Sequence, residues 1–198
     1  LVVCETRVNF SLAEGFRQKL CFDTVVSNSS GSLWLFYNDP FKLVMVGEGA
    51  QHASFLVYHN CLPIPVTISI VHAWCTREER RALWSGLLRD KPLHGPWLVG
   101  GDFNVVVETG EKKGGLPFPC SLSLDFLDYM SSAELFDAGF SGSSFTWCNN
   151  RLGRARIWKR LDWLLLNASC YDVGLAVSVS HLARDPSDHS PLLLSVKT

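Results

Sequence analysis

The run Pro96-Trp97-Leu98-Val99-Gly100-Gly101-Asp102-Phe103-Asn104 leads an apolar stretch directly into two polar side chains. An apolar run of this length, bounded by proline and glycine, predicts a buried β-strand. A second segment has the reverse order, because Ser187-Asp188-His189-Ser190 precedes Pro191-Leu192-Leu193-Leu194. Polar groups at the ends of such strands can face one cleft. Carboxylates, a carboxamide and an imidazole in one cleft suit attack of water on a phosphodiester beside a divalent cation.

Composition sets the class of protein. A chain of 198 residues with 47% hydrophobic content can bury one sizeable core, so we expect a single domain over residues 1–198. The formal net charge is −1, so binding to nucleic acid requires a local basic patch. The seven cysteines include no Cys-x-x-Cys pair, which argues against a zinc ribbon and a disulfide framework. We expect reduced thiols, most of them in the core.

No targeting signal or long apolar segment is visible in the sequence. We therefore expect a nuclear or cytoplasmic protein that does not associate with membranes. The sequence opens in the middle of an expected strand, which suggests that an upstream strand is missing.

Strands are expected to outnumber helices along the whole chain. Thr76 and Glu79 have the spacing of a capping box. The expected helices cover 11–20, 77–89 and 121–130. The expected strands cover 1–4, 23–27, 33–37, 42–46, 53–58, 66–71, 96–100, 144–148, 160–166, 175–180 and 191–196. This pattern favours two packed sheets with flanking helices over an alternating parallel fold.

Asp102 and Asn104 alternate with Phe103, so both polar side chains should lie on one side of the strand while Phe103 enters the core. In a catalytic interpretation, Asp102 holds or polarises the attacking water. Asn104 then donates a hydrogen bond to a phosphate oxygen or to Asp102. A turn stabilised by these side chains after a strand is the structural alternative.

His189 can act as a general base or acid if another group fixes its tautomer. Asp162 is the best candidate for that group, because an unpaired carboxylate that enters an apolar strand would be costly. Glu5 lies at the end of the first expected strand and can anchor a metal ion. The alternatives are a turn that leads into a strand for His189 and a surface glutamate for Glu5.

A basic cluster interleaved with Trp147 and Trp158 is the candidate surface for DNA. Contacts of this kind bind phosphates and do not read sequence. A solvated hairpin with its tryptophans in the core is the alternative. The basic residues are Arg151, Arg154, Arg156, Lys159 and Arg160.

Four segments, in this order along the chain, resemble the endonuclease/exonuclease/phosphatase superfamily, which has the deoxyribonuclease I-like fold. They are 3–7 (Val-Cys-Glu-Thr-Arg), 100–104 (Gly-Gly-Asp-Phe-Asn), 160–162 (Arg-Leu-Asp) and 187–191 (Ser-Asp-His-Ser-Pro). Segments 111–115, 145–151 and 157–162 further resemble the endonuclease domain of plant LINE-type non-LTR retrotransposons. The resemblance covers nearly the whole chain.

The resemblance implies a four-layer α/β (α+β) sandwich of two mostly antiparallel sheets with flanking helices. It implies Mg²⁺ or Mn²⁺ at Glu5, with Asp188 assisting at the metal or the water. Asp102 would align the water with Asn104 beside it. His189 would contact the scissile phosphate or act as base, held by Asp162.

His72 stands where many members of the superfamily have tyrosine, and its imidazole can still hydrogen-bond a phosphate. The implied reaction nicks DNA and leaves a 3′-hydroxyl that primes reverse transcription. The implied partners are therefore DNA and a reverse transcriptase domain, and we expect a monomer.

The sequence also departs from the family. The family's first strand carries an asparagine at the catalytic centre, and this sequence begins after that point. We therefore expect the first strand to be missing and the activity to be weakened. Two alternatives stay open: a degenerate, non-catalytic remnant that still binds nucleic acid, and a phosphatase of the same fold.

Overall fold

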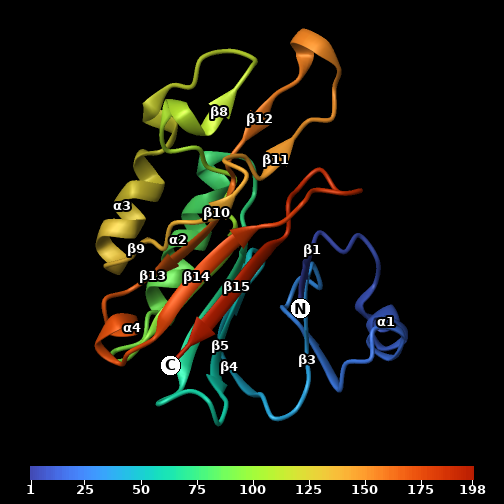
Figure 1. The fold of residues 1–198 in the computed structure, drawn as a ribbon, viewed down its shortest axis with the longest axis vertical. Helices are drawn as coiled ribbons and strands as arrows, with labels where there is room; N and C mark the ends of the chain where they lie inside the picture. The colour runs from blue at the N-terminus through green and yellow to red at the C-terminus, as the bar shows by residue number, and fades with distance from the viewer.

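A computed structural model describes residues 1–198, apart from the side chain of Cys120. Its largest element is a six-stranded sheet with the strand order β4-β5-β6-β7-β13-β9 (Figure 1). The β6–β7 pair is parallel and the other pairs of this sheet are antiparallel. The strands are β4 (Lys42–Gly49), β5 (His52–Tyr58), β6 (Val66–His72), β7 (Trp97–Asp102), β13 (Asp162–Leu166) and β9 (Phe136–Asp137).

The second layer consists of two separate three-stranded sheets, with the orders β1-β3-β2 and β10-β14-β15. Their strands are β1 (Val2–Cys4), β2 (Thr24–Ser27), β3 (Leu33–Tyr37), β10 (Ser141–Gly142), β14 (Ala176–His181) and β15 (Leu192–Lys197). A short fourth sheet extends from one end of the sandwich (Figure 1). It consists of β11 (Trp147–Cys148), β12 (Trp158–Lys159) and β8 (Lys112–Lys113).

Helices cover both outer faces. Leu83 and Leu87 of α2 (Arg77–Asp90) and Phe126 of α3 (Leu124–Ala133) pack with Val99 and Trp163 of the six-stranded sheet. On the other side, Ala13 of α1 (Ala13–Lys19) packs in one cluster with aromatic residues of β3. The helix–sheet–sheet–helix order confirms the four-layer sandwich. The remaining short helices are η1 (Phe10–Leu12), η2 (Thr109–Glu111), η3 (Cys120–Leu122), η4 (Gly153–Ala155) and α4 (Ser169–Asp172).

Two apolar clusters fill the space between the sheets. One joins the β1-β3-β2 sheet to β5 and β6 around Leu33 and Phe55. The other joins β14 and β15 to β7 and β13 around Leu98 and Leu166. Ile68 lies at the edge of both clusters, so it marks the seam between the two halves of the second layer.

Most expected elements are present, with two local differences. The capping box of Thr76 and Glu79 is formed. The helix expected over 11–20 is divided into the 3-10 turn η1 and α1, and the N-cap of η1 is Asn9, whose side chain accepts a hydrogen bond from the Ser11 amide. The expected strand over 144–148 is reduced to two residues, because the Thr146 carbonyl bonds to Ser190 outside the sheet.

The six cysteines whose side chains are described are free thiols. The expectation that most cysteines lie in the core is wrong, because Cys21, Cys61 and Cys75 are exposed and only Cys148 and Cys170 are buried. Cys120 lies outside the described side chains. Among the described residues, no helix is long and apolar enough to cross a membrane.

Candidate active site

Three adjacent strands end at the same rim of the six-stranded sheet. The register places Asp102 of β7 opposite Asp162 of β13 and beside His72 of β6. Phe103, the next residue, turns into the core and is fully buried, as the alternation in the sequence predicts. Backbone pairing therefore brings together polar residues that are 30 to 90 positions apart in sequence.

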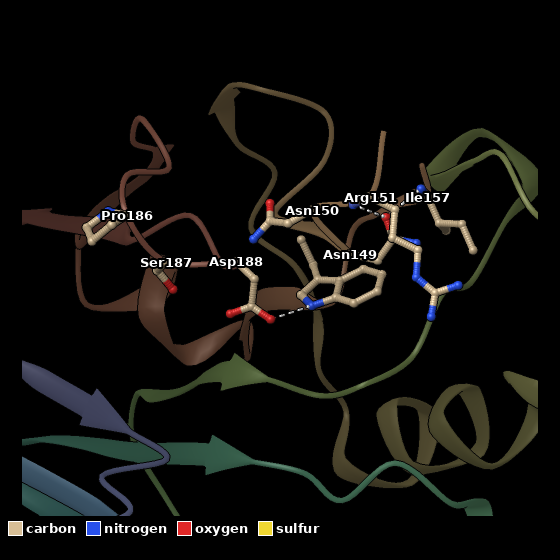
Figure 2. Close-up of a pocket in the computed structure, with 8 residues that line it drawn as sticks. Asn149, Asn150, Arg151, Ile157, Pro186, Ser187 and Asp188 are labelled. Atoms are coloured by element: carbon tan, nitrogen blue, oxygen red, sulfur yellow. Dashed lines mark hydrogen bonds between the residues drawn. The ribbon is translucent and has the colours of Figure 1, made fainter. Parts of the chain in front are cut away.

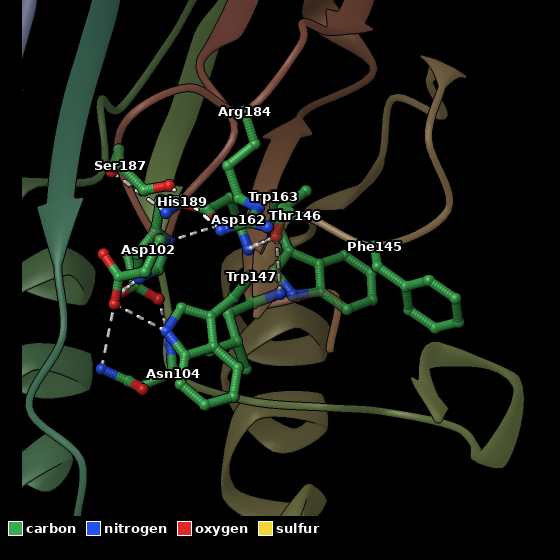
Figure 3. A network of polar contacts seen from close by, with 12 residues as sticks. Asp102, Asn104, Phe145, Thr146, Trp147, Asp162, Trp163, Arg184, Ser187 and His189 are labelled. Carbon is green, nitrogen blue, oxygen red and sulfur yellow. Dashed lines mark hydrogen bonds and ion pairs between the residues drawn. The ribbon is translucent and has the colours of Figure 1, made fainter. Parts of the chain in front are cut away.

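His189 reaches this rim from the loop before β15. Its Nδ1 lies 2.9 Å from Asp162 Oδ2, and its Nε2 lies 3.8 Å from Asp102 Oδ2 (Figure 3). One potential ligand atom from each of these three residues lies within 4.8 Å of the others. The expected contact between His189 and Asp162 is present, and it places the second ring nitrogen toward Asp102.

Asn104 fixes the carboxylate of Asp102. Its backbone N–H donates to Asp102 Oδ1 at 2.8 Å, and its Nδ2 donates to the Ala73 carbonyl at 2.8 Å and to Asp102 Oδ2 at 3.3 Å. Asn104 has φ = 51°, a left-handed conformation that asparagine tolerates better than most residues. The turn at Asn104 and the expected hydrogen bond from Asn104 to Asp102 are therefore both present.

Thr146 is a positioning residue that the sequence analysis missed. It is fully buried, and its Oγ1 accepts hydrogen bonds from the amides of Leu161 (3.0 Å) and Asp162 (3.1 Å). Its carbonyl accepts from the Ser190 amide at 2.7 Å. Thr146 thus ties the start of β13 to the loop of His189. In the sequence, the sign of a buried hydrogen-bonding role is that this polar residue stands between two aromatic residues, Phe145 and Trp147.

The electrostatics of the cluster favour a shared proton. Burial, followed by the charge of Asp162, raises the pKa of Asp102 to about 7. Burial alone would lower the pKa of His189, but the hydrogen bond and charge of Asp162, with Asp102 and Asp188, raise it to about 9. Near neutral pH His189 is therefore an imidazolium held between two carboxylates, and Asp102 titrates in the same range.

Glu5 and His72 lie beside this cluster. Glu5 Oε1 is 3.7 Å from His72 Nε2, and its Oε2 is 3.3 Å from Arg7 Nη2. Glu5 is exposed, while burial lowers the pKa of the partly buried His72. Both line a cavity of about 530 Å³ together with Asp102, Asp162 and His189. Glu5 is thus on the same cavity as the expected catalytic residues, outside the three-residue cluster.

Asp188 faces a second, larger cavity of about 700 Å³ (Figure 2). Its Oδ2 accepts a hydrogen bond from Trp147 Nε1 at 3.1 Å. The two cavities meet at Asp188 and Ser187, which line both. The other lining residues come mainly from the hairpin, and they are Asn149, Asn150, Arg151, Ile157 and Pro186.

The hairpin that connects β11 and β12 carries most of the expected basic patch. Arg151, Arg154 and Arg156 are exposed, and Lys159 is partly exposed with its Nζ 5.3 Å from the Trp147 ring centroid. Arg160 corrects the expectation. It is 5% exposed, and its guanidinium bonds to Glu111 and Asp137 and lies on the Trp163 ring. It therefore holds the base of the hairpin and cannot reach a phosphate.

The site has the donor set of a hard cation. The Asp102 and Asp162 carboxylates approach each other in a buried setting. Burial and the charge of Asp162 raise the pKa of Asp102, while His189 and the Asn104 backbone N–H offset part of this rise. Buried carboxylates of this kind are ordinarily paired or bound to a cation. The cluster can hold a metal ion, and Glu5 and Asp188 can supply further oxygens from the walls.

A sandwich of two β-layers with an Asp–Asn–Asp–His cluster at one rim defines a class of phosphoesterases. The family described as the Endonuclease/Exonuclease/phosphatase family matches residues 13–189. The chain therefore belongs to this family.

Solved structures show the same fold. The endonuclease domain of TRAS1, a telomere-specific non-LTR retrotransposon, has a TM-score of 0.63 and 14% identity, with 88% of this chain and 80% of that chain covered. The 3′ phosphatase NExo from Neisseria, bound to a product DNA hairpin, has a TM-score of 0.69 and 15% identity, covering 100% and 88%. TDP2 from Caenorhabditis elegans has a TM-score of 0.63 and 16% identity, covering 100% and 64%. No curated protein matches the chain.

Proposed function

We propose that this chain hydrolyses phosphodiester bonds of DNA with Mg²⁺ or Mn²⁺, and that it acts as the nicking endonuclease domain of a LINE-type element. The observation that carries the proposal is the cluster of Asp102, Asp162 and His189, whose ligand atoms lie within 4.8 Å of one another. The similarity in fold to a retrotransposon endonuclease domain and to a phosphatase bound to DNA supports the same substrate class.

In this proposal each residue of the cluster has a separate role. Asp162 accepts the Nδ1–H of His189, so the Nε2–H of the imidazolium is free to donate to a phosphate oxygen as charge develops. Asp102 lies beside His189, where its carboxylate can hold and orient the attacking water. Asn104 keeps that carboxylate in place through two hydrogen bonds.

A cation bound by Asp102 and Asp162, with Glu5 and Asp188 beside it, would polarise a phosphate oxygen and lower the pKa of a bound water. Oxygen ligands of this kind suit Mg²⁺, which keeps several waters and shares its shell with substrate phosphate. His189 Nδ1 is hydrogen-bonded to Asp162, so the carboxylates are the proposed metal ligands.

The hairpin supplies a surface for the DNA backbone. Arg151, Arg154 and Arg156 are exposed on one loop, and Lys159 lies over the ring of Trp147, which lines the larger cavity. Cations here would place the duplex across the rim and make binding dependent on salt.

A plasmid-nicking assay tests the proposal. We expect open-circular product with Mg²⁺ or Mn²⁺, none with EDTA, and a loss of at least about a hundredfold in His189→Ala. His94→Ala is the matched control, because His94 is exposed before β7, at the opposite end of that strand from Asp102. Binding of DNA that is sensitive to salt, without nicking by the wild type, would instead support the non-catalytic remnant. Phosphate release from a 3′-phosphorylated hairpin, with intact plasmid, would favour the phosphatase.

A further inference from the structure

The loop between β6 and α2 carries an exposed tryptophan beside the candidate active site. Trp74 stands two residues after His72 and is 44% exposed. The preceding residue, Ala73, is fixed to the neighbouring strand. Its amide donates to the Asp102 carbonyl at 2.7 Å, and its carbonyl accepts from Asn104 Nδ2 at 2.8 Å. Trp74 is therefore one residue away from the contacts that hold the Asp102 turn.

Two buried side chains hold the main chain of this loop. The Trp74 amide donates to Gln51 Oε1 at 2.7 Å, and Gln51 Nε2 donates to a main-chain carbonyl of α2 at 3.0 Å. Arg80 Nη1 donates to the carbonyls of Cys75 at 2.9 Å and Asn104 at 3.3 Å. Gln51 and Arg80 are both buried. The main chain that carries Trp74 is thus preorganised, although the indole itself lies at the surface.

The indole of Trp74 is free to meet a ligand. Among the described residues, no aromatic ring or cationic group stacks on it and no acceptor takes its N–H. A single exposed apolar side chain is common on protein surfaces. A free indole on a fixed main chain, next to a phosphoesterase site, has the properties of a stacking platform. By contrast, the ring N–H donates to an acceptor of the protein in Trp34, Trp84, Trp97, Trp147 and Trp163.

A cation for a phosphate lies within electrostatic reach of the same loop. Burial, followed by the charge of Lys112, lowers the pKa of Lys159, while the charges of Cys75 and Asp102 act in the opposite direction. Lys159 is thus close both to the loop that carries Trp74 and to the catalytic rim. A nucleotide there would have a cation for its phosphate and an indole face for its base.

An indole face distinguishes between forms of DNA. Inside a B-form duplex each base is covered on both faces by its neighbours, so an external indole stacks only on a base outside that stack. Such bases occur in single strands and at unpaired nucleotides in a duplex. Fully paired DNA would gain the phosphate contacts alone.

We propose that Trp74 stacks on an unpaired nucleobase beside the scissile phosphate, so that this chain prefers DNA with an unpaired nucleotide at that position to a continuous duplex. The proposal rests on the DNA substrate proposed above. Gln51 and Arg80 keep the indole in place, and Lys159 contacts an adjoining phosphate. Trp74 is a specificity-determining residue, because it touches the substrate away from the reacting atoms.

DNA binding in EDTA tests the proposal without cleavage. Two fluorescent duplexes of equal length are compared by anisotropy, one fully paired and one with a single unpaired nucleotide. We expect the wild type to bind the second about tenfold more tightly. Trp74→Ala should lose this preference and bind the paired duplex as the wild type does, while Trp74→Phe should keep most of the preference. Tyr171→Ala is the matched control, because Tyr171 is an exposed aromatic residue on α4, which follows the far end of β13.

Removing the base separates stacking from all other contacts. An abasic nucleotide at the unpaired position keeps the sugar and the phosphate but has no ring face. The wild type should bind this DNA as weakly as Trp74→Ala binds the parent DNA, and the two changes together should cost no more than either alone. Additive losses would place the indole against another part of the DNA and overturn the proposal.

The outcome is separable from that of the nicking assay. Equal, salt-sensitive binding of the wild type to paired and unpaired DNA overturns the role of Trp74 and leaves the nuclease proposal standing. Absence of DNA binding by the wild type overturns both. In nicking of the DNA with the unpaired nucleotide, Trp74→Ala should raise KM about tenfold with little change in kcat, because the indole does not touch the reacting atoms. A fall in kcat with unchanged KM would show a structural effect on the catalytic rim and overturn the proposal.

Discussion

Replacing Asp102 by asparagine should stabilise the metal-free protein at neutral to basic pH while removing its activity. Asp102 is 8% exposed, and its pKa is about 7 in the folded chain against an ordinary value of 3.8. Ionising this group in the folded state therefore costs about three pKa units, or about 4 kcal/mol. Asparagine is neutral and avoids that cost.

The net gain is smaller because one hydrogen bond is lost. The side-chain oxygen of asparagine can still accept from the Asn104 amide, but its NH₂ group cannot accept from Asn104 Nδ2. The loss of this hydrogen bond lowers the free energy of unfolding by about 1 to 2 kcal/mol. We therefore expect the free energy of unfolding to rise by about 2 kcal/mol in Asp102→Asn at about pH 8.

The sign of the pH dependence follows from the raised pKa. In the wild type, the stabilising contribution of protonated Asp102 is complete below 3.8, the pKa of this group in the unfolded chain. It is lost as the pH rises to the folded-state pKa of about 7. Urea unfolding with EDTA should therefore show the gain at about pH 8 and little or none at about pH 4.5. Asp188→Asn is the matched control, because Asp188 is an exposed carboxylate at the same rim. A variant no more stable than wild type at the higher pH, or equally stabilised at both, would refute this account.

Three further changes probe the surroundings of the cluster. Arg160→Met should lower the free energy of unfolding by about 3 to 5 kcal/mol, because it leaves Glu111 buried without its cation, while the salt dependence of DNA binding by the folded protein stays the same. Thr146→Val should reduce kcat about tenfold to a hundredfold with little change in KM, because the Asp162 amide loses its acceptor; recovery in Thr146→Ser separates the hydroxyl from packing. The single-turnover nicking rate should fall as pH rises through about 9, where His189 loses its proton, and a rate that stays flat to higher pH would exclude the imidazolium as a donor.

Local periodicity predicted the part of the site that lies along single strands. The alternation around Phe103 placed Asp102 at the rim and the aromatic ring in the core, as the burial of Phe103 confirms. The position of Asp162 at the start of an apolar strand also predicted that its carboxylate has a partner, because an unpaired buried carboxylate is costly. The contact with His189 supplies that partner.

The errors come from contacts that span long stretches of sequence. Lys159 and Arg160 are neighbours, so the sequence places both in one basic patch. An extended backbone points them to opposite sides, and the inward guanidinium meets Glu111 and Asp137, which are 49 and 23 positions away. Thr146 was missed for the same reason, because its two donors lie 15 and 16 positions ahead.

The proposed catalytic residues come from three separate sheets. Asp102 and Asp162 belong to the six-stranded sheet, Glu5 follows β1, and His189 precedes β15. Glu5 meets the cluster only through His72 at 3.7 Å, whereas the His189 loop is tied down by Thr146. The β1 side of the site is therefore the less constrained one.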